Sequence, residues 1–137
     1  MVYAGRLARA VTRSTSPGVP AATLRLLSLV DELGPSGISN LAQADRCSQP
    51  TISTAVRNLT EKGWAVKRAN PADARSSLVA LTDEGLSVLA EARRRNAAVV
   101  AARLEADPRH TVADLADAVG LLRHLLEDHP DESRDDL

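Results

Sequence analysis

The hydrophobic pattern changes its period at Gly63, and this change constrains the fold more than any other feature of the sequence. Before Gly63, apolar residues recur at i, i+3, i+4 and i+7, the spacing of one buried helix face. These residues are Ile52, Ala55, Val56 and Leu59. After Gly63, the runs WAVKR and SSLVAL resemble short strands, and ANPADAR between them has turn formers at its centre. The sequence therefore predicts a helix followed by a two-stranded hairpin with a long loop.

Local signals mark both ends of the helix before Gly63. Ser48 is placed to cap its start, and Pro50 stands in the first turn, where the missing N–H costs nothing. Gly63 closes the far end. A shorter helix, which Ser39 can cap, precedes it and ends near Ala44. Two short helices joined by a tight turn form the helix-turn-helix pattern.

Two helices are predicted before this pair, over residues 3–13 and 20–33. The second has apolar residues at the spacing of one buried face, namely Leu26, Leu29, Val30 and Leu33.

Two more helices are predicted after the hairpin. Thr82 caps the first, which can run until Pro108. Thr111 and Asp114 form a capping box for the second. Its apolar stripe consists of Leu115, Ala118, Val119, Leu122, Leu125 and Leu126. The tail from Pro130 is acidic, and we expect it to be disordered.

The chain of 137 residues is long enough for one compact domain. The predicted fold class is mainly α with a small β-hairpin. No window is apolar for long enough to span a bilayer, and the first residues lack the apolar core of a secretory signal. We therefore expect a cytoplasmic protein with no membrane partner. A single cysteine excludes an intrachain disulfide and a zinc cluster built from cysteines.

The charge distribution favours a nucleic-acid partner, although the net charge is only -1. Residues 45–75 hold six bases and three acids, a balance of 6 - 3 = +3, whereas acids dominate from residue 105 onward. A basic central region with an acidic end is an asymmetry typical of nucleic-acid-binding proteins.

The second helix of the pair has a polar face opposite its apolar one. At about 100° per residue, this face holds Pro50, Ser53, Thr54 and Arg57. Ser and Thr can contact bases or phosphates, Gln49 can pair with adenine, and Arg57 can take guanine or phosphate. An ordinary solvated helix face explains the same residues equally well.

The hairpin favours the functional interpretation. Lys67, Arg68 and Arg75 lie beside the helix, and a long arginine at a loop tip is suited to a narrow minor groove. Asp73, two residues before Arg75, can hold its guanidinium in one orientation. The alternative is an exposed ion pair of little consequence on a flexible loop.

Over residues 20–128, the sequence resembles the MarR family of bacterial winged-helix transcriptional regulators. The resemblance rests on the helix after Ser48, on the wing motif Asp73-x-Arg75 and on the junction Leu81-Thr82-x-x-Gly85. Further matching residues are Leu59, Glu61, Lys62, Gly63 and Arg68.

The resemblance implies a homodimer on double-stranded DNA. Recognition helices would enter successive major grooves and wing arginines the flanking minor grooves. The expected regions are 1–19 and 83–129 for dimerisation, 20–82 for DNA binding, and 130–137 as a tail. We expect a repressor that binds a pseudo-palindromic operator.

The DNA-binding residues expected on this basis share a place on the second helix or on the hairpin. They are Ser48, Gln49, Pro50, Thr51, Ser53, Thr54, Arg57, Lys67, Arg68, Asp73 and Arg75.

Two positions depart from the family pattern. Thr54 stands where many relatives have arginine, so one DNA contact is in doubt. Trp64 replaces a smaller aliphatic residue, and we expect it to pack where the wing meets the helix. Relatives often bind phenols or aromatic carboxylates, but with one Trp, one Tyr and no Phe this chain gives no sequence evidence for such an effector pocket.

Other interpretations have less support. One alternative is that Cys47 senses oxidants, but a buried residue in the turn is the simpler interpretation. Another is a metal site formed by His124, Glu127, Asp128 and His129, but surface charge near the end of the chain explains these residues more simply. The chain has no phosphate-binding loop, HExxH or nucleophile elbow, so we expect neither an enzyme nor a cofactor. The alternative to DNA binding is a winged-helix module for protein assembly. Such a wing would need exposed apolar residues, whereas NPADARSS is polar.

Overall fold

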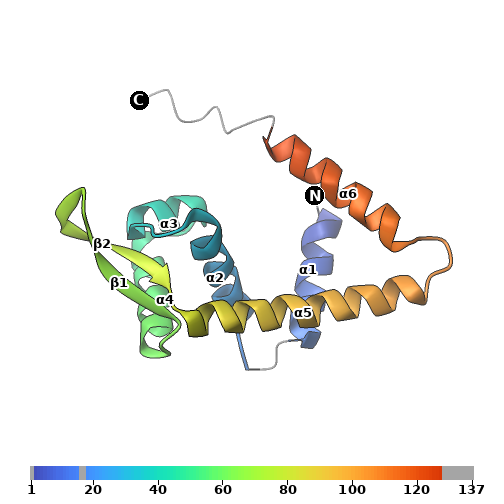
Figure 1. Ribbon diagram of the computed structural model, residues 1–137, viewed down its shortest axis with the longest axis horizontal. Coiled ribbons are helices and arrows are strands. Elements are labelled where there is room, and N and C mark those ends of the chain that lie inside the picture. Colours follow the sequence, from blue (N-terminus) through green and yellow to red (C-terminus); the bar gives the residue numbers. More distant parts are fainter. Residues whose placement is uncertain (1, 16–17, 128–137) are drawn as a thin grey trace. The chain divides into compact units, whose positions relative to one another are not determined.

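The computed structural model describes residues 2–15 and 18–127, and its helices and strands follow one another as Figure 1 shows. Contacts divide the chain into two compact units, residues 1–97 and 98–137, and each is described by itself. The elements are α1 (Val2–Thr15), α2 (Ala21–Leu33), α3 (Ile38–Ala44), α4 (Gln49–Glu61), β1 (Ala65–Asn70), β2 (Asp73–Leu81), α5 (Asp83–Glu105) and α6 (Val112–Glu127). This order confirms the predicted fold class.

The core of the first unit gathers apolar side chains from α2, α3, α4 and β2. The predicted inner face of α4 is confirmed, because Ile52, Val56 and Leu59 are all buried. Leu41 of α3 and Val79 of β2 are fully buried in the same cluster. The helix pair and the hairpin therefore share one core, which fixes the hairpin beside α4.

The predicted inner face of α2 is wrong at one position. Leu33 is 49% exposed, whereas Leu27, which the predicted stripe leaves out, is fully buried. Leu24 and Val30 lie on the same buried side at intervals of three residues. Leucines occur at several spacings in α2, so periodicity alone does not select the inward face. Leu33 is also the last residue of the helix, and Gly34 turns the chain away after it.

Of the four predicted helix caps, three are confirmed. Ser48 accepts a hydrogen bond from the Thr51 N–H at 3.3 Å, and Thr82 accepts one from the Gly85 N–H at 3.1 Å. In the capping box of α6, Asp114 Oδ2 lies 2.7 Å from the Thr111 nitrogen. The predicted cap of α3 is wrong, since that helix begins at Ile38 with Gly37 as its N-cap.

The hairpin is longer than predicted, and its loop is shorter. β1 and β2 pair antiparallel, and only Pro71 and Ala72 lie between them. The side chain of Asn70 closes this turn by accepting a hydrogen bond from the Ala72 N–H at 3.0 Å. Asp73 and Arg75 therefore belong to β2. The turn formers in ANPADAR predicted a long loop because the sequence pattern does not specify the contact between the Asn70 side chain and the Ala72 N–H.

Pairing within the hairpin is irregular near its tip. Ala69 pairs with Ser77, but Asn70 pairs with Asp73, so residues 74–76 bulge out of β2. Farther down, Ser36 forms an isolated bridge with Val79, with N···O distances of 3.1 and 2.9 Å. This bridge ties the hairpin to the segment between α2 and α3.

The start of α5 is joined to the end of α4 through hydrogen bonds from Thr82 to two backbone carbonyls. The Thr82 N–H donates to the Trp64 carbonyl at 3.1 Å, and its hydroxyl donates to the Gly63 carbonyl at 2.6 Å. One turn later, Gly85 lies against the same Trp64 carbonyl, so closely that a Cβ there would lie 2.0 Å from the oxygen. The contact requires glycine at position 85.

The apolar stripe predicted on α6 is present, and its side chains are exposed within the chain. Val119, Leu122 and Leu125 are each about half exposed. Position 126 and the predicted disordered tail lie outside the residues whose side chains the structure describes. None of the described helices has the length and apolarity needed to cross a membrane.

Replacing Gly85 by alanine should destabilise the protein severely, because backbone atoms cannot yield to a methyl group 2.0 Å from a carbonyl oxygen. We expect a loss in the free energy of unfolding of about 3 kcal/mol or more. Gly120→Ala in α6 is the matched control, since among the described residues no atom beyond its chain neighbours and its own helix backbone lies within 4 Å of the added Cβ. It should stabilise by about 0.5–1 kcal/mol through helix propensity. Urea denaturation measures both, and equal stabilities would contradict the described junction.

Candidate nucleic-acid interface

The polar residues predicted for the groove form the outer side of α4. The side chains of all seven are exposed: Ser48, Gln49, Pro50, Thr51, Ser53, Thr54 and Arg57. The face is rigidly held, because the opposite side of the same helix is buried in the core. A helix supported in this way presents its outer side chains in a fixed pattern.

Hydrogen bonds within α4 sort these residues into two groups. The hydroxyls of Ser48 and Thr51 lie 2.7 Å apart, and Thr54 donates back to the Pro50 carbonyl at 3.0 Å. Among the described contacts, the side chains of Gln49, Ser53 and Arg57 have no hydrogen bond or ion pair. The second group therefore keeps all of its side-chain hydrogen-bond donors and acceptors available for an external partner.

The hairpin adds further exposed cations, and they lie beside this helix because β1 contacts α4. Lys67 and Arg68 of β1 are both exposed. Because neighbouring residues of a strand point to opposite faces, the two cations leave the hairpin on different sides.

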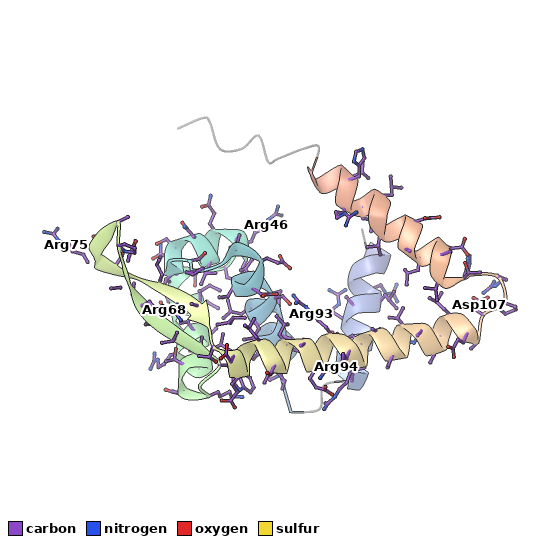
Figure 2. The ribbon with its side chains drawn as sticks, in the orientation of Figure 1. Arg46, Arg68, Arg75, Arg93, Arg94 and Asp107 are labelled. Atoms are coloured by element: carbon purple, nitrogen blue, oxygen red, sulfur yellow. The ribbon has the colours of Figure 1, made fainter. Side chains whose placement is uncertain are left out.

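Asp73 acts on Arg75 differently from the prediction. Its carboxylate accepts a hydrogen bond from the backbone N–H of Arg75 at 3.0 Å, and no ion pair joins it to the guanidinium within the described part of the chain. Figure 2 shows the Arg75 side chain projecting away from the tip of the hairpin. The expected contact with the guanidinium is thus replaced by a contact with the backbone, which shapes the bulge that Arg75 occupies.

The turn between α3 and α4 has an unusual backbone, which the sequence did not reveal. Arg46 has φ +53°, and it is the one non-glycine residue with positive φ in the described chain. Its neighbour Asp45 is bound by Arg25 of α2, with Nε···Oδ1 at 2.8 Å. A glycine or asparagine at position 46 would have signalled this conformation, and arginine does not.

Cys47 is half-buried in this turn, against the core. A hydrogen bond with Asp45, and then burial, raise the pKa of the thiol above its ordinary value. A higher pKa lowers the thiolate fraction at neutral pH, and the thiolate is the reactive form. The geometry thus gives oxidant sensing by Cys47 no added support.

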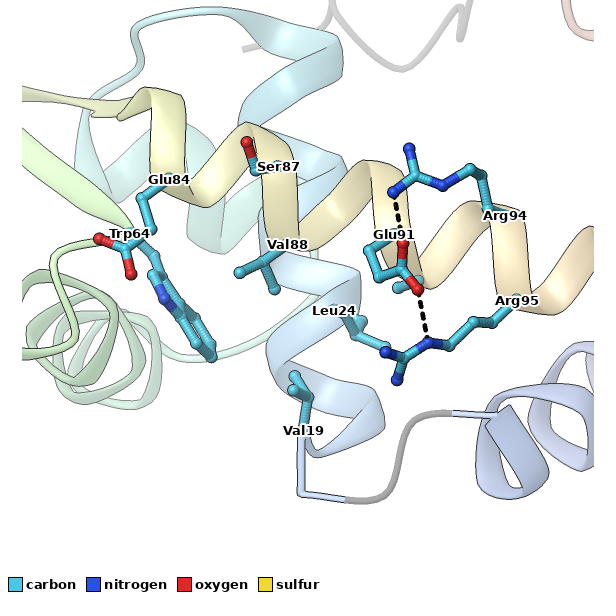
Figure 3. A pocket seen from close by; sticks show the side chains of 10 residues that line it. Val19, Leu24, Trp64, Glu84, Ser87, Val88, Glu91, Arg94 and Arg95 are labelled. Atoms are coloured by element: carbon cyan, nitrogen blue, oxygen red, sulfur yellow. Dashed lines mark hydrogen bonds and ion pairs between the residues drawn. The ribbon is translucent and has the colours of Figure 1, made fainter.

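A cavity that the sequence did not indicate lies beside α5. It has a volume of about 450 Å³ and is bounded by Trp64 and by apolar residues of α2 and α5 (Figure 3). Its rim holds Glu84, Glu91, Arg94 and Arg95. Hydrogen bonds from Arg94 and then Arg95 hold the pKa of Glu91 below its ordinary value. Two acids and two bases leave the rim without net charge, so charge does not select an occupant.

The metal site considered at His124, which the sequence did not favour, falls mostly outside the residues whose side chains the structure describes. His129 and Asp128 lie beyond residue 127, and the described part of the chain contains no group of three potential ligands.

The segment that holds the helix pair and most of the hairpin is similar to a known protein family. Residues 19–77, from the start of α2 to the middle of β2, match the model of the MarR family. Over this segment the chain is similar to the MarR family. Regulators of this family are DNA-binding transcription factors and not enzymes, in agreement with the expectation from the sequence. No curated protein matches the chain.

Solved structures share the fold well beyond the residues matched by the family model. A putative transcriptional regulator from Pseudomonas aeruginosa is 26% identical, with a TM-score of 0.76 over 92% of this chain and 88% of that one. MarR from E. coli, solved as a Cys-to-Ser variant complexed with operator DNA, is 21% identical, with a TM-score of 0.65 over 89% and 86%. PcaV from Streptomyces coelicolor, solved in complex with its natural ligand, is 23% identical, with a TM-score of 0.62 over 93% and 92%.

The contact of Asp73 with the Arg75 backbone can be tested without DNA. Asp73→Asn keeps a side-chain oxygen that can accept the bond, whereas Asp73→Ala removes it. The Arg75 amide should therefore exchange its hydrogen at the parental rate in the asparagine variant and several-fold faster in the alanine variant. NMR-detected hydrogen exchange measures this, and the Asn70 side-chain contact at the tip serves as an internal reference. Equal acceleration in both variants would favour the predicted charge pairing instead.

Proposed function

We propose that this protein is a sequence-specific double-stranded DNA-binding regulator of the MarR family that acts as a homodimer and represses transcription. The observation that carries the proposal is the exposed outer face of α4 with Arg75 projecting from the adjacent hairpin. The fold is also that of E. coli MarR, which has been solved with operator DNA.

In this proposal α4 lies in the major groove. Gln49, Ser53 and Arg57 have free side-chain donors and acceptors, so they are the residues that read base edges. Ser48, Pro50, Thr51 and Thr54 line the same face and make closer contact with the backbone of the duplex. The Thr54 hydroxyl already donates its hydrogen to the Pro50 carbonyl, so this hydroxyl can only accept further hydrogen bonds.

The hairpin supplies the second contact. Arg75 enters the flanking minor groove, whose negative potential attracts an arginine, and Asp73 sets the shape of the bulge from which it projects. Lys67 and Arg68 contact phosphates on the two sides of the wing. A protein-assembly module without a DNA target is the alternative, and the exposed tip argues against it because its side chains are polar or charged.

Dimerisation would use residues 1–19 and 83–129, the regions outside the proposed DNA-binding part at 20–82. The half-exposed apolar stripe of α6 supports this assignment, since contiguous exposed apolar residues mark interaction sites. A symmetric dimer presents its two recognition helices to half-sites about 10 base pairs apart, centre to centre. The operator is therefore pseudo-palindromic.

The cavity at Trp64 is the proposed site of a small-molecule effector. The cavity at Trp64 has about 450 Å³, within the range of roughly 300–1,000 Å³ typical of ligand pockets. It lies at the junction of the hairpin with α5, so an occupant could favour one spacing of the recognition helices over another. Trp64 is the only tryptophan, and its fluorescence is the measurement that reports occupation.

Selection from a random duplex library, followed by a salt titration, tests DNA binding. Arg75→Ala should weaken binding to the selected duplex about tenfold and lower the salt slope by about 1 for each lost contact, because a cation leaves the groove. Its thermal stability should not change, since Arg75 is exposed. Arg134→Gln in the acidic tail, outside the regions proposed for DNA binding and dimerisation, is the control for loss of one charge and should bind normally.

The result that contradicts the wing assignment is an Arg75→Ala variant with the parental affinity and salt slope. Failure to select any duplex would favour the protein-assembly alternative.

Dimerisation through α6 has its own test. Leu122→Glu places a charge in the apolar stripe and should convert the dimer to a monomer, because a carboxylate is too costly to bury unpaired. Ala113→Glu adds the same charge at an exposed position on the other side of α6 and should leave the dimer intact. Sedimentation equilibrium measures both, and a dimeric Leu122→Glu variant would show that the stripe lies outside the interface.

A further inference from the structure

Arg46 combines a demanding backbone conformation with an unengaged side chain. Its φ of +53° lies in the left-handed region, which glycine and asparagine adopt readily and arginine does not. Its side chain is exposed, and in the described residues it forms no hydrogen bond or ion pair (Figure 2). Neither packing nor pairing therefore accounts for arginine at this position.

The conformation itself is imposed by the residues around it. The Arg46 N–H donates to the Gln43 carbonyl at 3.1 Å, and the Cys47 N–H donates to the Ala42 carbonyl at 3.0 Å. Cys47 packs against the core, and Asp45 is held by Arg25 from α2. The turn is thus fixed on both sides of Arg46, and any residue placed there must adopt positive φ.

The same contacts leave the arginine available to an external anion. Asp45 is the nearest acid in sequence, and its carboxylate is already bound by Arg25 through contacts of 2.8 Å. The Cα of Arg46 lies within about 7 Å of the Cα of Ser48, because two residues span at most about 3.6 Å each. Ser48 begins the face of α4 assigned above to DNA. Arg46 is therefore an exposed cation at the border of the proposed DNA-binding surface.

We infer that Arg46 contacts a backbone phosphate of the bound duplex, as a residue of the DNA interface additional to those on α4 and the hairpin. A guanidinium can bind phosphate oxygens through two parallel hydrogen bonds, which a lysine cannot reproduce. This inference rests on the proposed function. It also explains why a residue that fits the turn poorly occupies it, since strained backbone at a surface position is a feature of functional sites.

The test separates stability from DNA affinity at one position. Arg46→Gly and Arg46→Asn remove the cation and suit the positive φ, so the melting temperature should stay constant or rise, by about 2–4 °C for glycine. Affinity for a duplex selected by the parent protein should fall about tenfold or more. The salt slope should fall by about 2 for a dimer, one contact in each half-site. Arg46→Lys should retain the slope with a smaller loss of affinity, and Arg134→Gln in the acidic tail should retain both.

Each outcome decides the inference. A lower melting temperature for the glycine and asparagine variants would show a structural role and overturn it. Parental affinity and slope in those variants, with Arg75→Ala still weakened, would overturn it and leave the proposed function standing. If the parent protein selects no duplex, the proposed function fails, and the phosphate contact fails with it.

Discussion

The backbone contact between Gly85 and the Trp64 carbonyl is the constraint on which the first unit depends. The carbonyl accepts the Thr82 N–H at 3.1 Å while the Gly85 Cα lies against it, and the Thr82 hydroxyl binds the carbonyl of Gly63. The end of α4, the start of β1 and the first turn of α5 thus meet at two successive residues. Because the contacts of the Trp64 carbonyl with Thr82 and Gly85 join backbone atoms, β1 and α5 cannot shift relative to each other by a side-chain rearrangement alone. The position of the wing relative to α4 follows from this junction together with the shared core.

The elements that the sequence predicted are those with strong local signals. The start and end of α4 were read from Ser48 and Gly63, and the structure has the cap at Ser48 and positive φ at Gly63. The start of α5 was read from Thr82 in the same way. Each of these signals acts within four residues, so the surrounding fold does not alter it. The resemblance to the MarR family rested on the same residues, and the family match over 19–77 confirms it.

The features that sequence reasoning missed depend on contacts between side chains that local patterns do not specify. The hairpin tip is short because the Asn70 side chain accepts a hydrogen bond from the Ala72 N–H. The Asp73 carboxylate accepts a hydrogen bond from the Arg75 backbone N–H, whereas the prediction was a charge pair with the Arg75 guanidinium. The inward face of α2 was ambiguous because its leucines satisfy two spacings, and only packing against α3 and α4 decides between them. The cavity at Trp64 was missed because a single aromatic residue gives no pattern. The assignments of residues to DNA contacts and of regions to dimerisation stay predictions.

Two of the places where the backbone in and beside the proposed DNA-binding surface departs from regular geometry each present an arginine. Arg75 stands in the bulge of residues 74–76, which the Asp73 carboxylate shapes, and Arg46 stands in the turn that the Arg25–Asp45 pair secures. In both cases an acid interacts with backbone or with another arginine, so the cation at the irregular position keeps its full charge for an external partner. A salt bridge to either arginine would neutralise it and fix its side chain away from solvent. The acids of this surface therefore act as structural supports, and the arginines stay available because their nearest acids are engaged elsewhere.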